Sequence, residues 1–116
     1  MFKVIVAGSR GFKDYNLLER KMDFYLSNKD EVEIVSGTAR GADVLGERYA
    51  VSRKYSVTRF PADWDKFGKS AGYKRNKQMA EYADACVVFW DGKSKGSEHM
   101  INLAEEHGLA LRIVRF

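Results

Sequence analysis

Two stretches of the sequence combine glycines with an arginine and an acid in a pattern suited to phosphate binding. Residues 8–14 read Gly-Ser-Arg-Gly-Phe-Lys-Asp, and residues 37–43 read Gly-Thr-Ala-Arg-Gly-Ala-Asp. Glycines let backbone N–H groups approach a ligand closely, and the guanidinium of Arg10 or Arg40 can bind a phosphate through two parallel hydrogen bonds. These stretches indicate recognition of an anionic, phosphate-bearing ligand.

A third stretch, residues 91–97, reads Asp-Gly-Lys-Ser-Lys-Gly-Ser. Ser97 suits a helix N-cap, and the amides of Gly96 and Ser97 would then be available to a phosphate. The stretch lacks the Gly-x-x-x-x-Gly-Lys-Ser/Thr pattern of a P-loop, and residues 8–11 lack the Gly-x-Gly-x-x-Gly dinucleotide fingerprint. Both absences argue against an ordinary NTPase or dehydrogenase.

A fourth stretch, residues 61–78, is long for a connection between two elements, and long structured loops often carry function. Trp64 could stack on a base, and Arg75 and Asn76 could contact a phosphate or a base edge. Structural roles are the alternative, with Trp64 packed against the sheet edge and Asn76 capping or packing its helix.

Asp43 also has two interpretations. In the first turn of a helix an acid complements the helix dipole, whereas beside a bound nucleotide it could accept hydrogen bonds from ribose hydroxyls. We expect ligand contacts from all four stretches, and no catalytic residue is assigned. The candidate ligand-binding residues are Gly8, Ser9, Arg10, Gly37, Arg40, Gly41, Asp43, Trp64, Arg75, Asn76, Asp91, Gly92, Lys93, Ser94, Gly96 and Ser97.

Metal chemistry has little support in the sequence. The single cysteine, Cys86, lies in an apolar run, so an intrachain disulfide is excluded and a buried, inert thiol is expected. His99 and His107 form no zinc ligand set with it. We expect neither a metal nor a cofactor.

The four stretches alternate with short apolar runs and with segments of helical period. The apolar runs are 3–7, 33–36, 57–60, 86–90 and 111–115. Their nearly continuous hydrophobicity predicts five strands covered on both faces. Apolar residues at i, i+3, i+4 and i+7 between them predict four helices, the last ending at Gly108. This alternation predicts an α/β fold, a doubly wound, Rossmann-like domain with a five-stranded parallel sheet in the order 3-2-1-4-5 and helices on both faces.

Ligands of such sheets bind outside the carboxyl ends of the strands, here between the first and fourth. The four stretches all follow strands at that edge, and they hold ten of the twenty Lys and Arg residues against five acids. Their charge is +5 and that of the remaining chain is −1, so the whole positive excess falls at the predicted binding edge.

The chain shows no internal repeat and no linker, and we expect residues 1–116 to form one domain. No apolar run approaches the roughly 18 residues of a membrane span. The apolar stretch at residues 1–8 is too short for a secretory signal. We therefore expect a cytoplasmic protein without a membrane partner.

Six motifs occur in order along the chain. They are Gly8-Ser9-Arg10-x-Phe12, Gly37-x-Ala39-Arg40-Gly41-x-Asp43, Pro61-Ala62-Asp63-Trp64, Gly68-Lys69-x-Ala71-Gly72, Arg75-Asn76-x-x-Met79 and Phe89-Trp90-Asp91-Gly92-Lys93-Ser94-x-Gly96-Ser97. Together they resemble the SLOG superfamily, the Rossmann-like group that contains the Lonely Guy phosphoribohydrolases and the DprA/Smf proteins. The resemblance is closest to its small YspA/YpsA-related branch, which is common in bacteria and their phages.

The resemblance implies a pocket for nucleotides or nucleotide-derived signals, in enzymes that cut a base from ribose phosphate or in non-enzymatic sensors. In the Lonely Guy pattern Pro-Gly-Gly-x-Gly-Thr-x-x-Glu, a catalytic Glu lies three residues after the Thr. When Gly96-Ser97 is aligned with that Gly-Thr, Met100 takes the Glu position, and the nearby Glu98 would face about 200° around the helix. This departure argues against the phosphoribohydrolase reaction.

Three functions remain open. The chain could be a sensor or carrier that binds a nucleotide-derived small molecule. It could be a nucleotide-processing hydrolase of N-glycosidic or phosphoester bonds, with Asp43, Asp63, Asp91 and Glu98 as candidate acids or bases. It could also be an accessory protein that binds single-stranded nucleic acid, for which a charge of +5 is small. A homo-oligomer paired through a helical face would suit a domain of this size.

Overall fold

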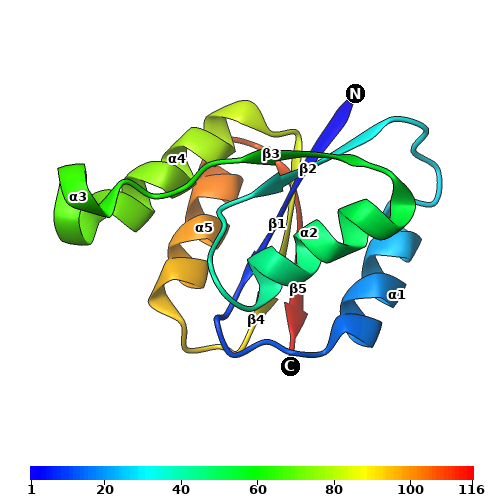
Figure 1. The fold of residues 1–116 in the computed structure, drawn as a ribbon, viewed down its shortest axis with the longest axis horizontal. Coiled ribbons are helices and arrows are strands. Elements are labelled where there is room, and N and C mark those ends of the chain that lie inside the picture. The colour runs from blue at the N-terminus through cyan, green and yellow to red at the C-terminus, as the bar shows by residue number, and fades with distance from the viewer.

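A parallel sheet runs through the centre of the computed structural model, which describes residues 1–116 (Figure 1). Its strands are β1 (Phe2–Gly8), β2 (Val32–Ser36), β3 (Ser56–Arg59), β4 (Ala85–Trp90) and β5 (Ala110–Arg115). All neighbouring pairs are parallel, and the strand order is β3-β2-β1-β4-β5, which confirms the predicted topology. The N- and C-termini lie at opposite ends of the sheet.

Four main helices connect the strands, as predicted. They are α1 (Tyr15–Tyr25), α2 (Ala42–Arg53), α4 (Ala71–Tyr82) and α5 (Lys95–Glu106). A single additional turn, α3 (Trp64–Phe67), and a 3₁₀ turn, η1 (Gly68–Ser70), precede α4. No helix is both long and apolar enough to cross a membrane.

Local signals explain where the helices begin and end. The Asp14 carboxylate caps α1 by accepting the Leu17 N–H at 3.0 Å, and Gly108 adopts a φ of +70° just beyond α5, as its sequence position predicts. The prediction that Ser97 caps α5 is wrong. Ser94 is the N-cap, and Ser97 lies inside the first turn with its hydroxyl 3.1 Å from that of Ser94.

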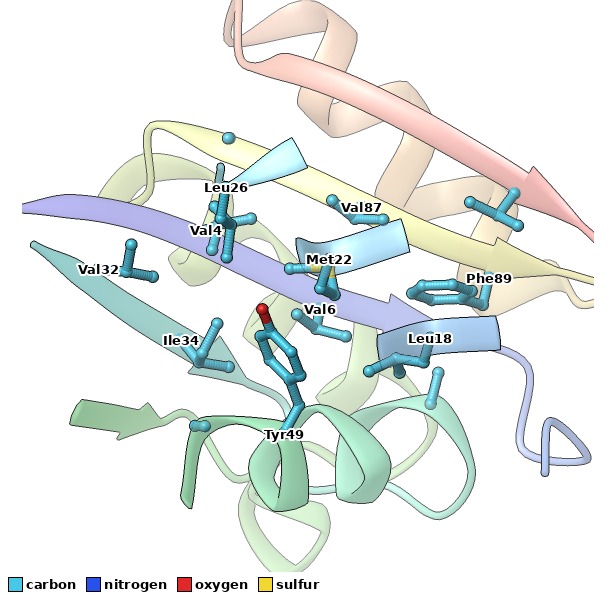
Figure 2. Packing of buried hydrophobic residues seen from close by; sticks show 14 of the residues in the cluster. Val4, Val6, Leu18, Met22, Leu26, Val32, Ile34, Tyr49, Val87 and Phe89 are labelled. Carbon is cyan, nitrogen blue, oxygen red and sulfur yellow. The ribbon is translucent and has the colours of Figure 1, made fainter. Parts of the chain in front are cut away.

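The first hydrophobic core lies between the sheet and the helices α1 and α2. Leu18, Met22 and Leu26 of the α1 segment form a row over β1 and β4, and Tyr49 of α2 points into the space between α1 and the sheet (Figure 2). Gly46 brings α2 close to β1, because a Cβ there would lie 2.7 Å from Cγ1 of Val6. The close approach of α2 to β1 at this position therefore requires glycine.

The second core lies on the opposite face, where α4 and α5 pack against the sheet. Ile5, Val35 and Val88 of the central strands contact Met79 of α4 and Met100 of α5 in this cluster. Two helices on each face leave the sheet edges partly open. No residue of β3 is fully buried and Ile113 of β5 is exposed, so the prediction that every strand is covered on both faces is wrong for the two edge strands.

The segment α3–η1 contains no buried residue. It projects beyond the end of α4, away from the sheet (Figure 1). We call residues 61–70 the arm. Trp64 belongs to it and is half-exposed, so the alternative in which this side chain packs against the sheet edge does not hold.

Candidate ligand-binding crevice

A cavity of about 410 Å³ opens at the carboxyl ends of β1 and β4, where the strand order reverses. Ten of the sixteen candidate residues line it, and they come from all four stretches. These ten are Gly8, Ser9, Arg10, Asp43, Arg75, Asn76, Asp91, Ser94, Gly96 and Ser97. The prediction that the stretches after β1, β2 and β4 converge on a common cavity agrees with this geometry.

A second cavity of about 380 Å³ adjoins the first and shares Arg10, Ala39 and Arg75 with it. Three further candidates, Gly37, Arg40 and Trp64, line this second cavity. We call the two cavities together the crevice. Its outer part is bordered by the arm, and its inner part lies between α2 and the start of α5.

Three candidates lie outside the crevice. Gly41 packs against the backbone of Ser9 and Arg10, and Gly92 packs against the guanidinium of Arg115. Lys93 is exposed. Sequence reasoning also missed eight lining residues, five in the inner cavity and three in the outer one, which are Ala7, Gly11, Ala39, Met79 and Met100, and Thr38, Pro61 and Ala62. Gly11 and Ala39 lie in stretches already singled out, whereas Ala7, Met79 and Met100 have the same periodic spacing as core residues, so no local signal separates them from the core.

The loops after β1, β2 and β4 are fixed to one another. The Ser9 hydroxyl accepts the Asp91 N–H at 3.1 Å, which joins the loop after β1 to the loop after β4. Gly41 joins the first loop to the second, because a Cβ there would lie 2.7 Å from the Arg10 carbonyl oxygen and closer still to that of Ser9. Arg10 itself is exposed and makes no hydrogen bond or ion pair within the chain, so its guanidinium is free to bind an anion.

The partly buried Arg75 and the buried Asp43 lie near each other on the wall of the inner cavity. Arg75 donates from Nη1 to the Gly37 carbonyl oxygen and from Nε to Oδ1 of Asn76, the second at 3.0 Å. Burial lowers the pKa of Arg75, and the Asp43 carboxylate partly opposes that effect. Burial likewise raises the pKa of Asp43 to about 6, against the opposing effects of the Ala39 N–H and the Arg75 charge. Gly37 makes room for both groups, since a Cβ there would lie 2.6 Å from Nη1 and 2.8 Å from Oδ2 of Asp43.

The start of α5 forms the opposite wall. Oδ1 of Asp91 accepts the N–H groups of Lys93 and Ser94 at 2.8 and 2.9 Å, and these hydrogen bonds lower the pKa of Asp91. The amides of Lys95 and Gly96 have no acceptor in the chain. Free amides at a helix N-terminus carry partial positive charge and favour an anion.

Asn76 connects this wall to α4. Its Nδ2 donates to the Gly96 carbonyl oxygen at 3.3 Å and lies 3.3 Å from Nδ1 of His99. Burial lowers the pKa of His99, which favours the neutral ring. The side chain of Asn76 therefore positions α5 and the Arg75 guanidinium, in addition to lining the cavity.

The lining of the crevice is suited to binding an anion that also carries hydrogen-bond donor groups. Two guanidiniums and the α5 amides can bind phosphate, and the carboxylates of Asp43 and Asp91 can accept hydrogen bonds. Of the four acids considered as acid or base catalysts, only these two line the inner cavity. Asp63 instead caps α3 by accepting the Lys66 N–H at 3.1 Å.

Comparisons with known proteins agree with this architecture. The sequence profile of the YspA, cpYpsA-related SLOG family matches residues 2–67. The chain is 34% identical over 116 residues to the Gene 61 protein of Mycobacterium phage D29, covering 94% of this chain and 93% of that protein.

Two solved structures of DNA processing protein A (DprA) share the fold. The chain matches the protein from Streptococcus pneumoniae with a TM-score of 0.78 and 21% identity, over 97% of this chain and 50% of that one. It matches the protein from Helicobacter pylori, for which a single-stranded DNA binding mode is described, with a TM-score of 0.66 and 19% identity, over 97% and 64%. The chain therefore spans half of one DprA chain and less than two thirds of the other.

Proposed function

Because the chain belongs to the YspA, cpYpsA-related SLOG family and its glycine-rich loops converge on one crevice, we propose that it binds a nucleotide or nucleotide-derived phosphate ligand there, as a sensor or carrier. The observation that supports this function best is the convergence of Arg10, Arg75 and the free amide of Gly96 on the inner cavity at the ends of β1 and β4. These donors come from three separate segments of the chain.

The electrostatics favour an anion at the inner end of the crevice. Arg75 is partly buried, and in such a setting a guanidinium interacts with a phosphate more strongly than it would in water. The outer end offers the exposed indole of Trp64, on which a base could stack. A ligand with a phosphate at one end and a base at the other therefore suits both ends.

Calorimetric titration with AMP, ADP-ribose, NAD and cyclic nucleotides tests the proposal. Arg10→Ala is expected to weaken binding about 10- to 100-fold, the usual loss for a hydrogen-bonded charge. It should leave stability nearly unchanged, because the exposed Arg10 side chain makes no hydrogen bond or ion pair within the chain. Arg20→Ala is the matched control, since Arg20 is exposed on α1 and lies outside the crevice. Absence of binding for every nucleotide, or equal losses in both variants, would refute the proposal.

Binding of single-stranded nucleic acid is a second candidate, favoured by the composition of the arm. Trp64 and Phe67 are 51% and 37% exposed, and the ammonium groups of Lys66 and Lys74 lie 5.1 and 4.9 Å from the Phe67 ring centroid. Exposed aromatic rings beside lysines are the usual means of holding successive bases and phosphates. The fold shared with DprA adds to this candidate.

Salt dependence separates the two candidates. A strand that contacts several phosphates along the arm loses affinity linearly with the logarithm of salt concentration, whereas a mononucleotide responds weakly. Oligonucleotide binding that is insensitive to salt would exclude the arm as a strand-binding surface.

Hydrolysis of the bound nucleotide is a third candidate, and Asp43 is the residue that favours it. A carboxyl in a cavity with a pKa of about 6 can exchange protons near neutral pH. Chromatography of nucleotides incubated with the protein and with Asp43→Asn decides the matter, because turnover through this group must disappear in the variant.

A further inference from the structure

Asp43 presents one carboxylate oxygen to the inner cavity. The residue lies in the first turn of α2, is only 5% exposed, and lines the cavity wall. Its Oδ2 accepts the Ala39 N–H at 3.1 Å, whereas Oδ1 has no hydrogen-bond partner in the chain. No fully buried side-chain oxygen lacks a partner, so Oδ1 is open to the cavity.

The surroundings restrict what this oxygen can bind. An ionised carboxylate only accepts hydrogen bonds, so its partner must carry an O–H or N–H group. No ion pair joins Asp43 to Arg75 or Arg10, which leaves the oxygen uncommitted. A phosphate next to Asp43 would be repelled, so the phosphate belongs beside Arg10 and the α5 amides and a hydroxyl group belongs beside Asp43.

A purely structural role explains Asp43 poorly. An acid that complements a helix dipole does so from an exposed position without losing its hydration. Asp43 is instead buried, and its raised pKa shows that the fold keeps this charge at a cost in stability. Gly37 leaves room for the carboxylate and for Arg75 on the same stretch of backbone, which holds the acceptor and the cation side by side.

Building on the proposed function, we infer that Asp43 makes the crevice selective for ribonucleotides over 2′-deoxyribonucleotides, because Oδ1 accepts a hydrogen bond from the ribose 2′-hydroxyl. A hydrogen bond to a charged acceptor corresponds to a preference of about 10- to 100-fold in affinity. A 2′-deoxyribonucleotide removes one donor and leaves the carboxylate oxygen dehydrated without a partner. The same interaction disfavours DNA as the ligand of the inner cavity.

The experiment compares AMP, GMP, CMP and UMP with their 2′-deoxy counterparts by calorimetric titration. Wild-type protein is expected to bind at least one ribonucleotide about tenfold or more tightly than its 2′-deoxy form. Asp43→Asn is expected to reduce that ratio to about one while keeping the fold. Asp91→Asn is the matched control, because Asp91 is the other carboxylate of the inner cavity and its Oδ1 already binds two backbone amides, so the ratio should persist.

The outcomes separate this inference from the proposed function. Equal affinities of the two sugars for wild-type protein overturn the inference and leave nucleotide binding intact, whether or not Asp43→Asn folds. A preference that survives in Asp43→Asn also overturns it. Arg10→Ala should weaken both sugars equally and preserve the ratio. If no nucleotide binds at all, the proposed function fails and the selectivity fails with it.

Discussion

Gly41 joins the loop after β1 to the loop after β2. Its replacement by alanine should destabilise the fold in two ways, by backbone strain and by contact of the new Cβ with the backbone of the first loop. Its φ of +78° and ψ of −126° are a conformation that residues with a side chain rarely adopt, at a cost of about 1–3 kcal/mol. A Cβ would also lie 2.7 Å from the Arg10 carbonyl oxygen. Because that atom belongs to the backbone and cannot rotate away, overpacking adds about 1–3 kcal/mol.

Gly68 provides an unusually close control. Its φ of +56° and ψ of −133° are nearly the same as those of Gly41, but a Cβ there would meet no atom within 4 Å. Gly68→Ala therefore carries the backbone strain alone, about 1–3 kcal/mol, and Gly41→Ala carries about 2–6 kcal/mol. Gly96→Ala, with neither strain nor contact, is the baseline and should be neutral or slightly stabilising.

Urea unfolding of the three variants measures these differences. Gly41→Ala should unfold at a clearly lower urea concentration than Gly68→Ala, and it should also bind nucleotides more weakly because the Arg10 loop must move. If the two variants lose the same free energy of unfolding within about 0.5 kcal/mol, the contact between the first two loops contributes nothing and the reasoning is wrong.

Three further predictions concern single side chains. Asp43→Asn should stabilise the fold at pH 7 by about 2–3 kcal/mol, because burial raises the carboxyl pKa from 3.8 to about 6. Because the folded protein binds this proton more tightly than the unfolded chain, ionisation of Asp43 costs no stability below about pH 4, and its cost grows as the pH rises through 6. Urea midpoints of wild-type protein and Asp43→Asn that differ equally at pH 4 and pH 7 would contradict this. Trp64→Ala should lower the free energy of unfolding by about 1–2 kcal/mol, because the side chain is 51% exposed and only the remainder loses apolar burial. It should also lower calorimetric affinity for nucleotides about tenfold and leave that for inorganic phosphate unchanged. Cys86 should react with a thiol reagent only after unfolding, because the side chain is fully buried and burial raises its pKa; rapid absorbance change in the folded protein would be inconsistent with that burial.

The sheet could be predicted because its signals are local and its connections follow general rules. Short, almost continuous apolar runs mark the strands, and the right-handed crossover with a switch point leaves few topologies for them. The prediction of full coverage was wrong at the edge strands, although their sequences carry a local signal. Arg59 interrupts the apolar run of β3, and Arg112 and Arg115 interrupt that of β5, whereas the run in β4 contains no charged residue.

The crevice was predicted where residue type signals chemistry and missed where it does not. Arginines, glycines and acids that follow strands indicate a site, whereas Met79 and Met100 look like core residues from their spacing. The choice of Ser94 over Ser97 as the cap of α5 also depends on three-dimensional contacts. The Trp90 indole donates to the Ser94 carbonyl oxygen at 3.1 Å and the Asp91 carboxylate binds the Ser94 N–H, which together fix the helix start.

The arm lines part of the crevice but contributes little to the hydrophobic cores. Since none of its residues from Trp64 to Ser70 is buried, substitutions there forfeit little hydrophobic free energy. Mutations of the arm can therefore accumulate with little effect on whether the protein folds, while those at Pro61, Ala62 and Trp64 alter the lining of the outer cavity. Random libraries confined to this segment should yield mostly soluble variants whose preferences among small molecules differ, which makes the arm the natural starting point for redirecting specificity.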